Sequence, residues 1–207
     1  MKLFFIRKQL GIVGERIVRE LNGTACLTLN PPKQKQAMGC AKSFGRAITD
    51  LKELEEALSC YVSSVCNKLR QQKSLVSRIE ILLQTNLFLP AHKRYQASQS
   101  YNLVQPTQDT RRVIGATKLC LRKIYRAEYA YQKVGIMLLD LVPKTQQRDL
   151  FSEPLFDVMN VVDNINHTLG SEAIFLGAQG TKQHWQRRHD LATPQYTTHW
   201  QELLSVK

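Results

Sequence analysis

The acidic residues that lie close enough together in the chain to share a metal ion are Glu53, Glu55 and Glu56. Carboxylates at a fixed separation can hold Mg²⁺ for phosphoryl transfer. These three fall within residues 50–73, where apolar residues recur every three or four positions and predict an amphipathic helix. The glutamates occupy positions between the apolar ones. We therefore interpret them as solvent-exposed surface charge rather than as a two-metal site.

Histidine and cysteine give no stronger indication of catalysis. His184 and His189 lack the spacing of a metal site, and no serine or cysteine stands in a nucleophile motif. The 5 cysteines include no C-x-x-C pair, and Arg7 and Lys8 interrupt the apolar N-terminal segment too early for a secretion signal. We expect free, buried thiols in a reducing cytoplasm, no metal or other cofactor in this chain, and no membrane partner.

Positive charge is the clearest chemical signal. The 29 Lys and Arg residues exceed the 17 Asp and Glu residues, which gives a net charge of +12. Such a charge attracts polyanions, and salt-sensitive attraction to phosphates is the usual basis of nonspecific nucleic-acid binding. An anionic membrane surface would compete, but no predicted helix pairs a strongly basic face with a bulky apolar one. The composition therefore favours a nucleic-acid partner.

The predicted helix at 50–73 can bury its apolar stripe only against neighbouring elements, and both of its flanks are typical of strands. A second amphipathic helix is predicted after Pro106, with Thr107 or Asp109 as its N-cap. The predicted strands are residues 37–45, 76–85, 95–105 and 131–139. The order strand, helix, strand, strand, helix, strand predicts an α+β sandwich with two helices on one face of a four-stranded sheet.

The regions on either side of the sandwich are simpler. Two short helices separated by Gly11 are predicted within residues 1–23, and the prolines, lysines and glutamines of 24–36 suit an extended linker. The sandwich is predicted to occupy residues 37–142. A partly irregular tail, with one helix near 154–169, follows at 143–207.

The sheet face that the helices leave open is predicted to bind a phosphate backbone. It should carry hydroxyls, amides and cations but few aromatic residues, which suits phosphates better than stacked bases. Tyr131 is expected on this side too. The polar residues expected there are Arg78, Gln84, Ser98, Ser100 and Lys133, with Lys42, Ser43 and Arg46 at the end of the first strand. For each of them, an ordinary solvated polar side chain is the alternative.

Several stretches of the chain resemble the C-terminal half of UmuC-type, Y-family translesion DNA polymerases, the group that includes the catalytic subunit of bacterial polymerase V. The matching stretches are FIRKQLGIVGERIVRELNG, AKSFGRAITD, LVQPTQDTRRVIGAT, AYQKVGIML, QRDLF and WQRRHDLATPQYTTHWQELL. Together they cover nearly the whole chain. The resemblance implies the end of a thumb, a DNA-binding little finger and a C-terminal tail of an error-prone polymerase of the SOS response to DNA damage.

The resemblance also implies roles for particular residues. Ser43 and Arg46 in KSFGR, Ser98 and Ser100 in the polar strand, and Lys133 in YQKVG would contact the phosphates of template and primer. The full set of implied DNA contacts is Lys42, Ser43, Arg46, Arg78, Ser98, Ser100 and Lys133. Because backbone contacts fix position without reading bases, binding should depend little on DNA sequence.

Two segments after the sandwich resemble parts of the family that bind proteins. Residues 147–151, with Gln147, Asp149, Leu150 and Phe151, are similar to the peptide that binds the bacterial sliding clamp. In such a peptide Leu and Phe fill apolar pockets while the glutamine amide fixes the register. The alternative is a structural Leu-Phe pair on the sheet.

The tail aromatics Trp185, Tyr196 and Trp200 would, by the same resemblance, help to hold UmuD or the recombinase filament. Folding back onto the domain is the alternative for these three side chains.

The chain departs from a complete family enzyme in one respect. The carboxylates that hold Mg²⁺ would lie in a palm that precedes Met1, so this chain should be inactive alone. Our first hypothesis is a noncatalytic portion that binds DNA and clamp. The second is a truncated regulatory subunit that competes with an intact polymerase for clamp, DNA or UmuD. The third is the C-terminal part of an active enzyme whose palm is supplied by a separate chain.

Overall fold

The computed structural model of the chain describes residues 3–28, 34–144, 158–170, 173–181, 183–186 and 192–203. It divides into two compact units, Met1–Gln34 and Lys35–Lys207. In the first unit, helix α1 (Leu3–Leu21) is interrupted at Gly11, whose φ of 69° and ψ of −170° are not helical. The two helical segments predicted around this glycine are therefore confirmed. Gly23, with a φ of 80°, follows the helix end.

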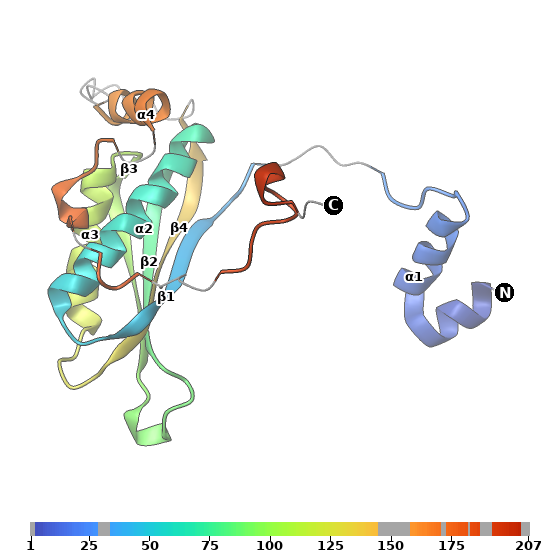
Figure 1. Cartoon of the computed structure of the whole chain (residues 1–207), viewed down its shortest axis with the longest axis horizontal. Coiled ribbons are helices and arrows are strands. Elements are labelled where there is room, and N and C mark those ends of the chain that lie inside the picture. The colour runs from blue at the N-terminus through green and yellow to red at the C-terminus, as the bar shows by residue number, and fades with distance from the viewer. Residues whose placement is uncertain are drawn as a thin grey trace. The chain divides into compact units, whose positions relative to one another are not determined.

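The second unit is the predicted α+β sandwich. Its elements are β1 (Met38–Ile48), α2 (Leu51–Gln71), β2 (Ser74–Thr85), β3 (Gln96–Thr107), α3 (Thr110–Ile124) and β4 (Tyr131–Pro143). The strands form one antiparallel sheet in the order β1-β4-β2-β3. Both helices cover the same face of this sheet (Figure 1). The predicted fold class and element order are confirmed.

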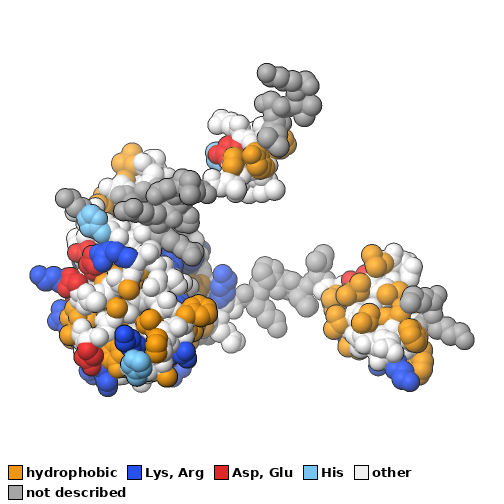
Figure 2. Space-filling view, turned by 60° about the horizontal axis from the view of Figure 1, so that its bottom comes forward, with side chains coloured by type: hydrophobic (Ala, Val, Ile, Leu, Met, Phe, Trp, Pro, Cys, Tyr) orange, Lys and Arg blue, Asp and Glu red, His pale blue; other side chains and the backbone are white. Residues whose placement is uncertain are grey.

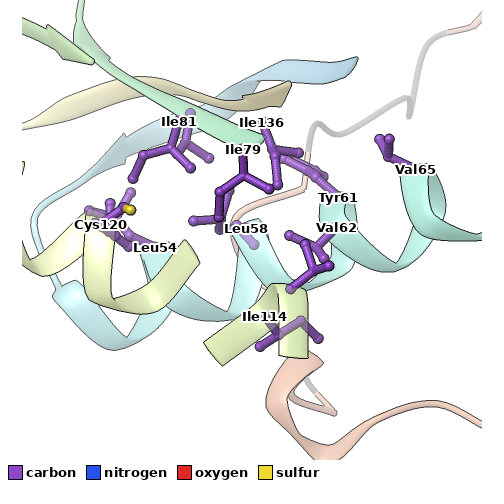
Figure 3. Close-up of a cluster of buried hydrophobic side chains, with 14 of the residues drawn as sticks. Leu54, Leu58, Tyr61, Val62, Val65, Ile79, Ile81, Ile114, Cys120 and Ile136 are labelled. Atoms are coloured by element: carbon purple, nitrogen blue, oxygen red, sulfur yellow. The ribbon is translucent and has the colours of Figure 1, made fainter. Parts of the chain in front are cut away.

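Helix α2 supplies most of the helical side of the core. Its N-cap is Asp50, whose carboxylate accepts a hydrogen bond from the Glu53 backbone N–H, at 3.4 Å. The apolar stripe of α2 faces the middle strands of the sheet (Figure 3). The buried stripe residues are Leu54, Leu58, Tyr61, Val62, Val65 and Leu69. Burial of each such side chain stabilises the fold by roughly 1.5–3 kcal/mol relative to exposure.

The expectation that Tyr131 shares the open side of the sheet with Lys133 is wrong. The ladder pairs Lys133 with Gln84 but Tyr131 with Thr85, so the register shifts by one residue at this end of β4. The extra residue turns the Tyr131 ring into the core, where it is fully buried. Its hydroxyl accepts from the Arg126 N–H at 2.8 Å and donates to the Arg126 carbonyl at 3.0 Å.

Helix α4 (Val158–Leu169) and residues 177–179 pack against α2. Helix α4 is tied to α2 through Arg70, whose Nε lies 2.5 Å from Asp163 Oδ2. The Arg70 side chain is 6% exposed and also donates to Thr110 Oγ1, at 2.7 Å. In the part of the chain that the structure describes, no helix combines the length and the apolarity that crossing a membrane requires.

Candidate nucleic-acid interface

The open face of the sheet is built from alternate residues of the four strands. Residues paired directly across an antiparallel ladder point to the same side, so the register groups them into rows. One row consists of Ser43, Lys133, Gln84 and Gln96. It places a hydroxyl, an ammonium and two amides side by side, and each of these groups is a hydrogen-bond donor. We call these four residues the donor row.

The donor row confirms that Ser43, Gln84 and Lys133 share the open side. Gln84 is more covered than expected, because its neighbours in the row leave it only 8% exposed. Gln96 was not among the predicted site residues. Its pairing with Gln84 depends on the register of the β2–β3 hairpin, and one strand's residue pattern does not contain that information.

The next two rows carry three small residues and one methionine on β1 and β4. Gly39 pairs with Met137, which is 47% exposed, and Ala41 pairs with Gly135. A Cβ added to Gly135 would lie 2.6 Å from the Ala41 Cβ, so the two strands leave no room for a side chain there. Glycine inside a strand is typical of sites where another backbone approaches closely. On β3 the same rows end in the exposed Ser98 and Ser100, as predicted.

The cations of the open face are Lys133 and Arg78. Arg78 Nε lies 3.2 Å from Asp140 Oδ2, and Glu80 follows Arg78 on the same side of β2. No carboxylate of the described residues forms an ion pair with Lys133. Lys133 is therefore the cation whose charge is available to a phosphate at this face.

Lys42 lies on the other side of the sheet, so its expected place on the open face is wrong. It pairs with Val134, which is buried under the helices, and its Nζ lies 5.6 Å from the centre of the Tyr61 ring on α2. Burial, aided by nearby thiols, raises the pKa of Tyr61, so the ring beneath the ammonium is neutral. Successive side chains of a strand point to opposite faces, so Lys42 must lie on the face opposite to that of Ser43.

Arg46 also points toward the helices rather than the open face. Its Nη2 lies 2.5 Å from Glu53 Oε1 on α2. Arg46 alternates in phase with Phe44 and Ile48, which are buried on the helix side of β1. The side chain is half exposed at the edge of the sheet. DNA binding by Lys42 and Arg46 stays a prediction, but it would occur at the β1 edge.

The predicted acidic surface cluster is only partly on the surface. Glu55 is buried between α2 and α3, where Arg122 Nε lies 2.8 Å and Lys118 Nζ 3.5 Å from its carboxylate oxygens. The helix pattern places Glu55 between apolar positions but does not show that α3 covers it. Among the described residues, no group of three His, Cys, Asp or Glu side chains could hold a metal ion.

A cavity lies away from the sheet, between α2, α4 and residues 174–179. Its volume is about 570 Å³, and its polar lining consists mainly of neutral amides and hydroxyls. Arg70 points into it but is held by Asp163, and Ser63 Oγ accepts from Gln179 Nε2 at 2.7 Å.

The tail aromatics behave differently from one another. Trp185 is buried, with its ring centre 6.3 Å from Phe44 and 5.6 Å from Tyr61, so it folds back onto the domain. Tyr196 and Trp200 are 42% and 88% exposed. Folding back, one of the two alternatives, therefore holds for Trp185. The candidate clamp peptide at 147–151 lies outside the described residues.

Comparison with known families agrees with the extent of the sandwich. The family model described as the impB/mucB/samB family C-terminal domain matches residues 35–150, which is more than half of the chain. The chain belongs to the impB/mucB/samB family. Residues 157–206 of this family member match a second model, described as a domain of unknown function, DUF4113. That segment contains α4 and Trp185.

Similar proteins of the impB/mucB/samB family include Protein UmuC of Salmonella typhimurium, 35% identical over 99% of this chain and 50% of the relative. Protein SamB of Salmonella typhimurium is 34% identical over 98% of this chain and 49% of its own. Protein MucB of Escherichia coli is 34% identical over 96% and 48%. The chain spans about half the length of the curated relatives it matches. The predicted resemblance to UmuC-type proteins is confirmed.

Among solved structures, a chain from the insertion ternary complex of Dbh DNA polymerase is similar to this impB/mucB/samB family member. The TM-score is 0.44 at 13% sequence identity, over 69% of this chain and 39% of that chain.

Proposed function

We propose that this chain is the DNA-binding and sliding-clamp-binding portion of an error-prone translesion DNA polymerase, acting in DNA repair. The open face of the sheet grips the backbone of primed duplex DNA without reading its sequence. The observation that carries the proposal is the donor row, in which Lys133 stands between a hydroxyl and an amide and forms no ion pair with a carboxylate of the described residues.

The shape of the open face supports the same partner. Ala41 and Gly135 leave the β1–β4 part of the face without large side chains apart from Met137, while Ser98 and Ser100 offer hydroxyls on β3. The described strand residues of this face include no exposed aromatic ring, which suits phosphate and sugar contacts rather than base stacking. The net charge of +12 adds a long-range attraction that does not depend on sequence. Catalysis, with its Mg²⁺-binding carboxylates, is assigned to a palm outside this chain.

A salt series of binding to primed duplex DNA tests the role of the open face. Lys133→Ala should reduce the slope of log affinity against log salt by about 0.9, the value for one neutralised phosphate. The matched control is Lys52→Ala, which removes an exposed lysine from α2 on the other side of the sheet and should leave the slope nearly unchanged. Equal slopes for Lys133→Ala and wild type would refute the assignment of the open face.

The clamp-binding part of the proposal rests on residues 147–151. Replacing both Leu150 and Phe151 by Ala should abolish binding to a purified bacterial sliding clamp and leave DNA affinity unchanged, because only the two apolar anchors are lost. Arg148→Ala is the matched control, since the second position of the motif is variable. If the double variant binds the clamp as wild type does, the motif is a chance match.

A further inference from the structure

The loop that joins β2 to β3 presents an aromatic ring to solvent. Phe88 is 96% exposed and its neighbour Leu87 is 55% exposed. We call residues 86–94 the hairpin tip; it extends beyond the helices at one end of the sandwich (Figure 1). A large apolar side chain held fully in water is costly unless it has a partner, so the position of Phe88 calls for an explanation.

Hydrogen bonds hold the hairpin tip in one shape. Asn86 Oδ1 accepts from the Phe88 N–H at 2.9 Å, and Arg94 Nε donates to the Leu89 carbonyl across the loop at 2.5 Å. The base of the loop is closed by Thr85, whose N–H donates to the Tyr95 carbonyl at 2.9 Å. These hydrogen bonds fix the turn that carries the exposed Phe88. A pre-organised ring loses little entropy when it binds a partner.

Lysine and arginine side chains occur both on the loop and at the neighbouring end of α3. Lys93 and Arg94 belong to the loop itself, and Lys123 lies near the C-terminal end of α3. Arg126, in the loop after α3, reaches the same end. Two contacts of Tyr95 join these elements: its ring lies 5.0 Å from the Arg126 guanidinium carbon, and its hydroxyl donates to the Ile124 carbonyl at 2.7 Å.

Figure 2 brings this end of the sandwich forward and shows hydrophobic side chains beside Lys and Arg side chains. None of the four Lys and Arg side chains forms an ion pair with a carboxylate of the described residues. Glu128 is the acidic residue of the adjoining loop. The end is therefore strongly positive around an apolar centre.

We propose that the hairpin tip is a second DNA site, which binds single-stranded DNA. Phe88 stacks on an unpaired base while Lys93 of the loop and Lys123 of α3 hold the flanking phosphates. Base stacking on an aromatic ring between cations is the common mode of single-strand binding, and a duplex does not offer a free base face to a protruding ring. The choice of DNA as the polyanion rests on the proposed function. The site itself is separate from the open face.

The test compares binding of the whole chain to an oligo-dT strand and to a blunt duplex. Phe88→Ala should weaken single-strand binding about 5- to 150-fold, which corresponds to the loss of one stacked base, and change duplex affinity less than about twofold. Leu119→Ala is the matched control, because it removes an exposed apolar side chain from α3. Thermal unfolding should be unchanged in both variants, since neither side chain is buried.

Two further variants separate stacking from simple apolar contact. Phe88→Trp should retain single-strand affinity, whereas Phe88→Leu should lose it although the side chain stays apolar. Lys93→Ala should make the salt slope for single strands shallower by about 0.7. Wild-type single-strand affinity for Phe88→Ala, or full retention by Phe88→Leu, overturns the proposal and leaves the tip as a contact for an acidic protein. The Lys133→Ala duplex experiment is unaffected by either outcome.

Discussion

The two faces of the sheet carry alternate residues of the same strands. The pattern along each strand determines the helix-covered face, whereas the open face depends on which residues are neighbours across the strands. On the helix-covered face, Ile79, Ile81 and Leu83 of β2 are all fully buried, so any apolar residue of similar size in that pattern would form a core. On the open face, the residues between them have a function only through their cross-strand neighbours. Lys133 belongs to the donor row because β1, β2 and β3 place Ser43 and two glutamines beside it.

The comparison also shows how little of the charge lies on the open face. Its two cations, Lys133 and Arg78, are accompanied by Glu80 and by Asp140, which pairs with Arg78. The excess of 12 positive charges must therefore lie mainly elsewhere on the chain, including the hairpin tip. At the open face, hydrogen-bond donors should contribute more to DNA binding than net charge does. We therefore expect a single phosphate-binding cation there.

Among the substitutions that distinguish the two faces, the largest expected effect is on stability. Ile81→Ala should lower the free energy of unfolding by about 2–5 kcal/mol, because it leaves a cavity between the sheet and α2. Ser100→Ala, on the open face of the paired strand, should change it by less than about 0.5 kcal/mol. Urea unfolding measures both. Similar losses for the two variants would contradict the assignment of the covered and open sides.

A smaller effect tests the close approach of β1 and β4 at Gly135. Gly135→Ala should cost about 1–3 kcal/mol, because the new Cβ would meet the Ala41 Cβ at 2.6 Å. Adding Ala41→Gly should restore most of the loss, and Ala41→Gly alone should be mildly destabilising. Unfolding of the three variants forms a double-mutant cycle. If the two changes are additive, the close approach of β1 to β4 is not what excludes a side chain at residue 135.

The sequence predicts those features that depend on local period. The apolar stripe of α2 follows from residues three or four positions apart and is confirmed. Of the two candidate N-caps of α3, Thr107 and Asp109, the structure has Asp109. The face assigned to Tyr131 is wrong because the β2–β4 ladder shifts by one residue there, and such a shift is decided by pairing with another strand. Lys42 and Arg46 share the side of the buried Phe44 and Ile48, so the two-residue period of β1 places them on the helix side.

Burial of charge is a second feature that one helix does not reveal. Glu55 lies among the polar positions of α2, yet α3 covers it and brings Arg122 and Lys118 to its carboxylate. The residues of the hairpin tip, with Asn86 and Pro90 among them, predict a turn but not its neighbours. The end of α3 is joined to the base of this loop by Tyr95, whose ring lies 5.0 Å from the Arg126 guanidinium carbon and whose hydroxyl donates to the Ile124 carbonyl at 2.7 Å.

The smallest expected effect concerns the N-cap of α3, one of the two helices that cover one face of the sheet. Burial alone would raise the pKa of Asp109, but hydrogen bonds from the side chain and backbone N–H of Arg111, with the charges of Arg111 and Arg112, hold it below its usual value. Because the folded pKa is lower than the unfolded one, the ionised cap stabilises the protein above the unfolded pKa of about 3.9. That contribution is lost as the pH falls through the folded pKa.

Asp109→Ala should therefore lower the free energy of unfolding by about 1 kcal/mol at pH 7, and the difference from wild type should shrink below about pH 4. Asp109→Asn is the matched control: its amide oxygen can still accept from the Arg111 N–H, so what it loses is the charge. Urea unfolding at pH 7, 5 and 3.5 measures all three proteins. A difference between wild type and Asp109→Ala that stays constant over this range would mean that the hydrogen-bond geometry of the cap, and not its charge, secures α3 over the sheet.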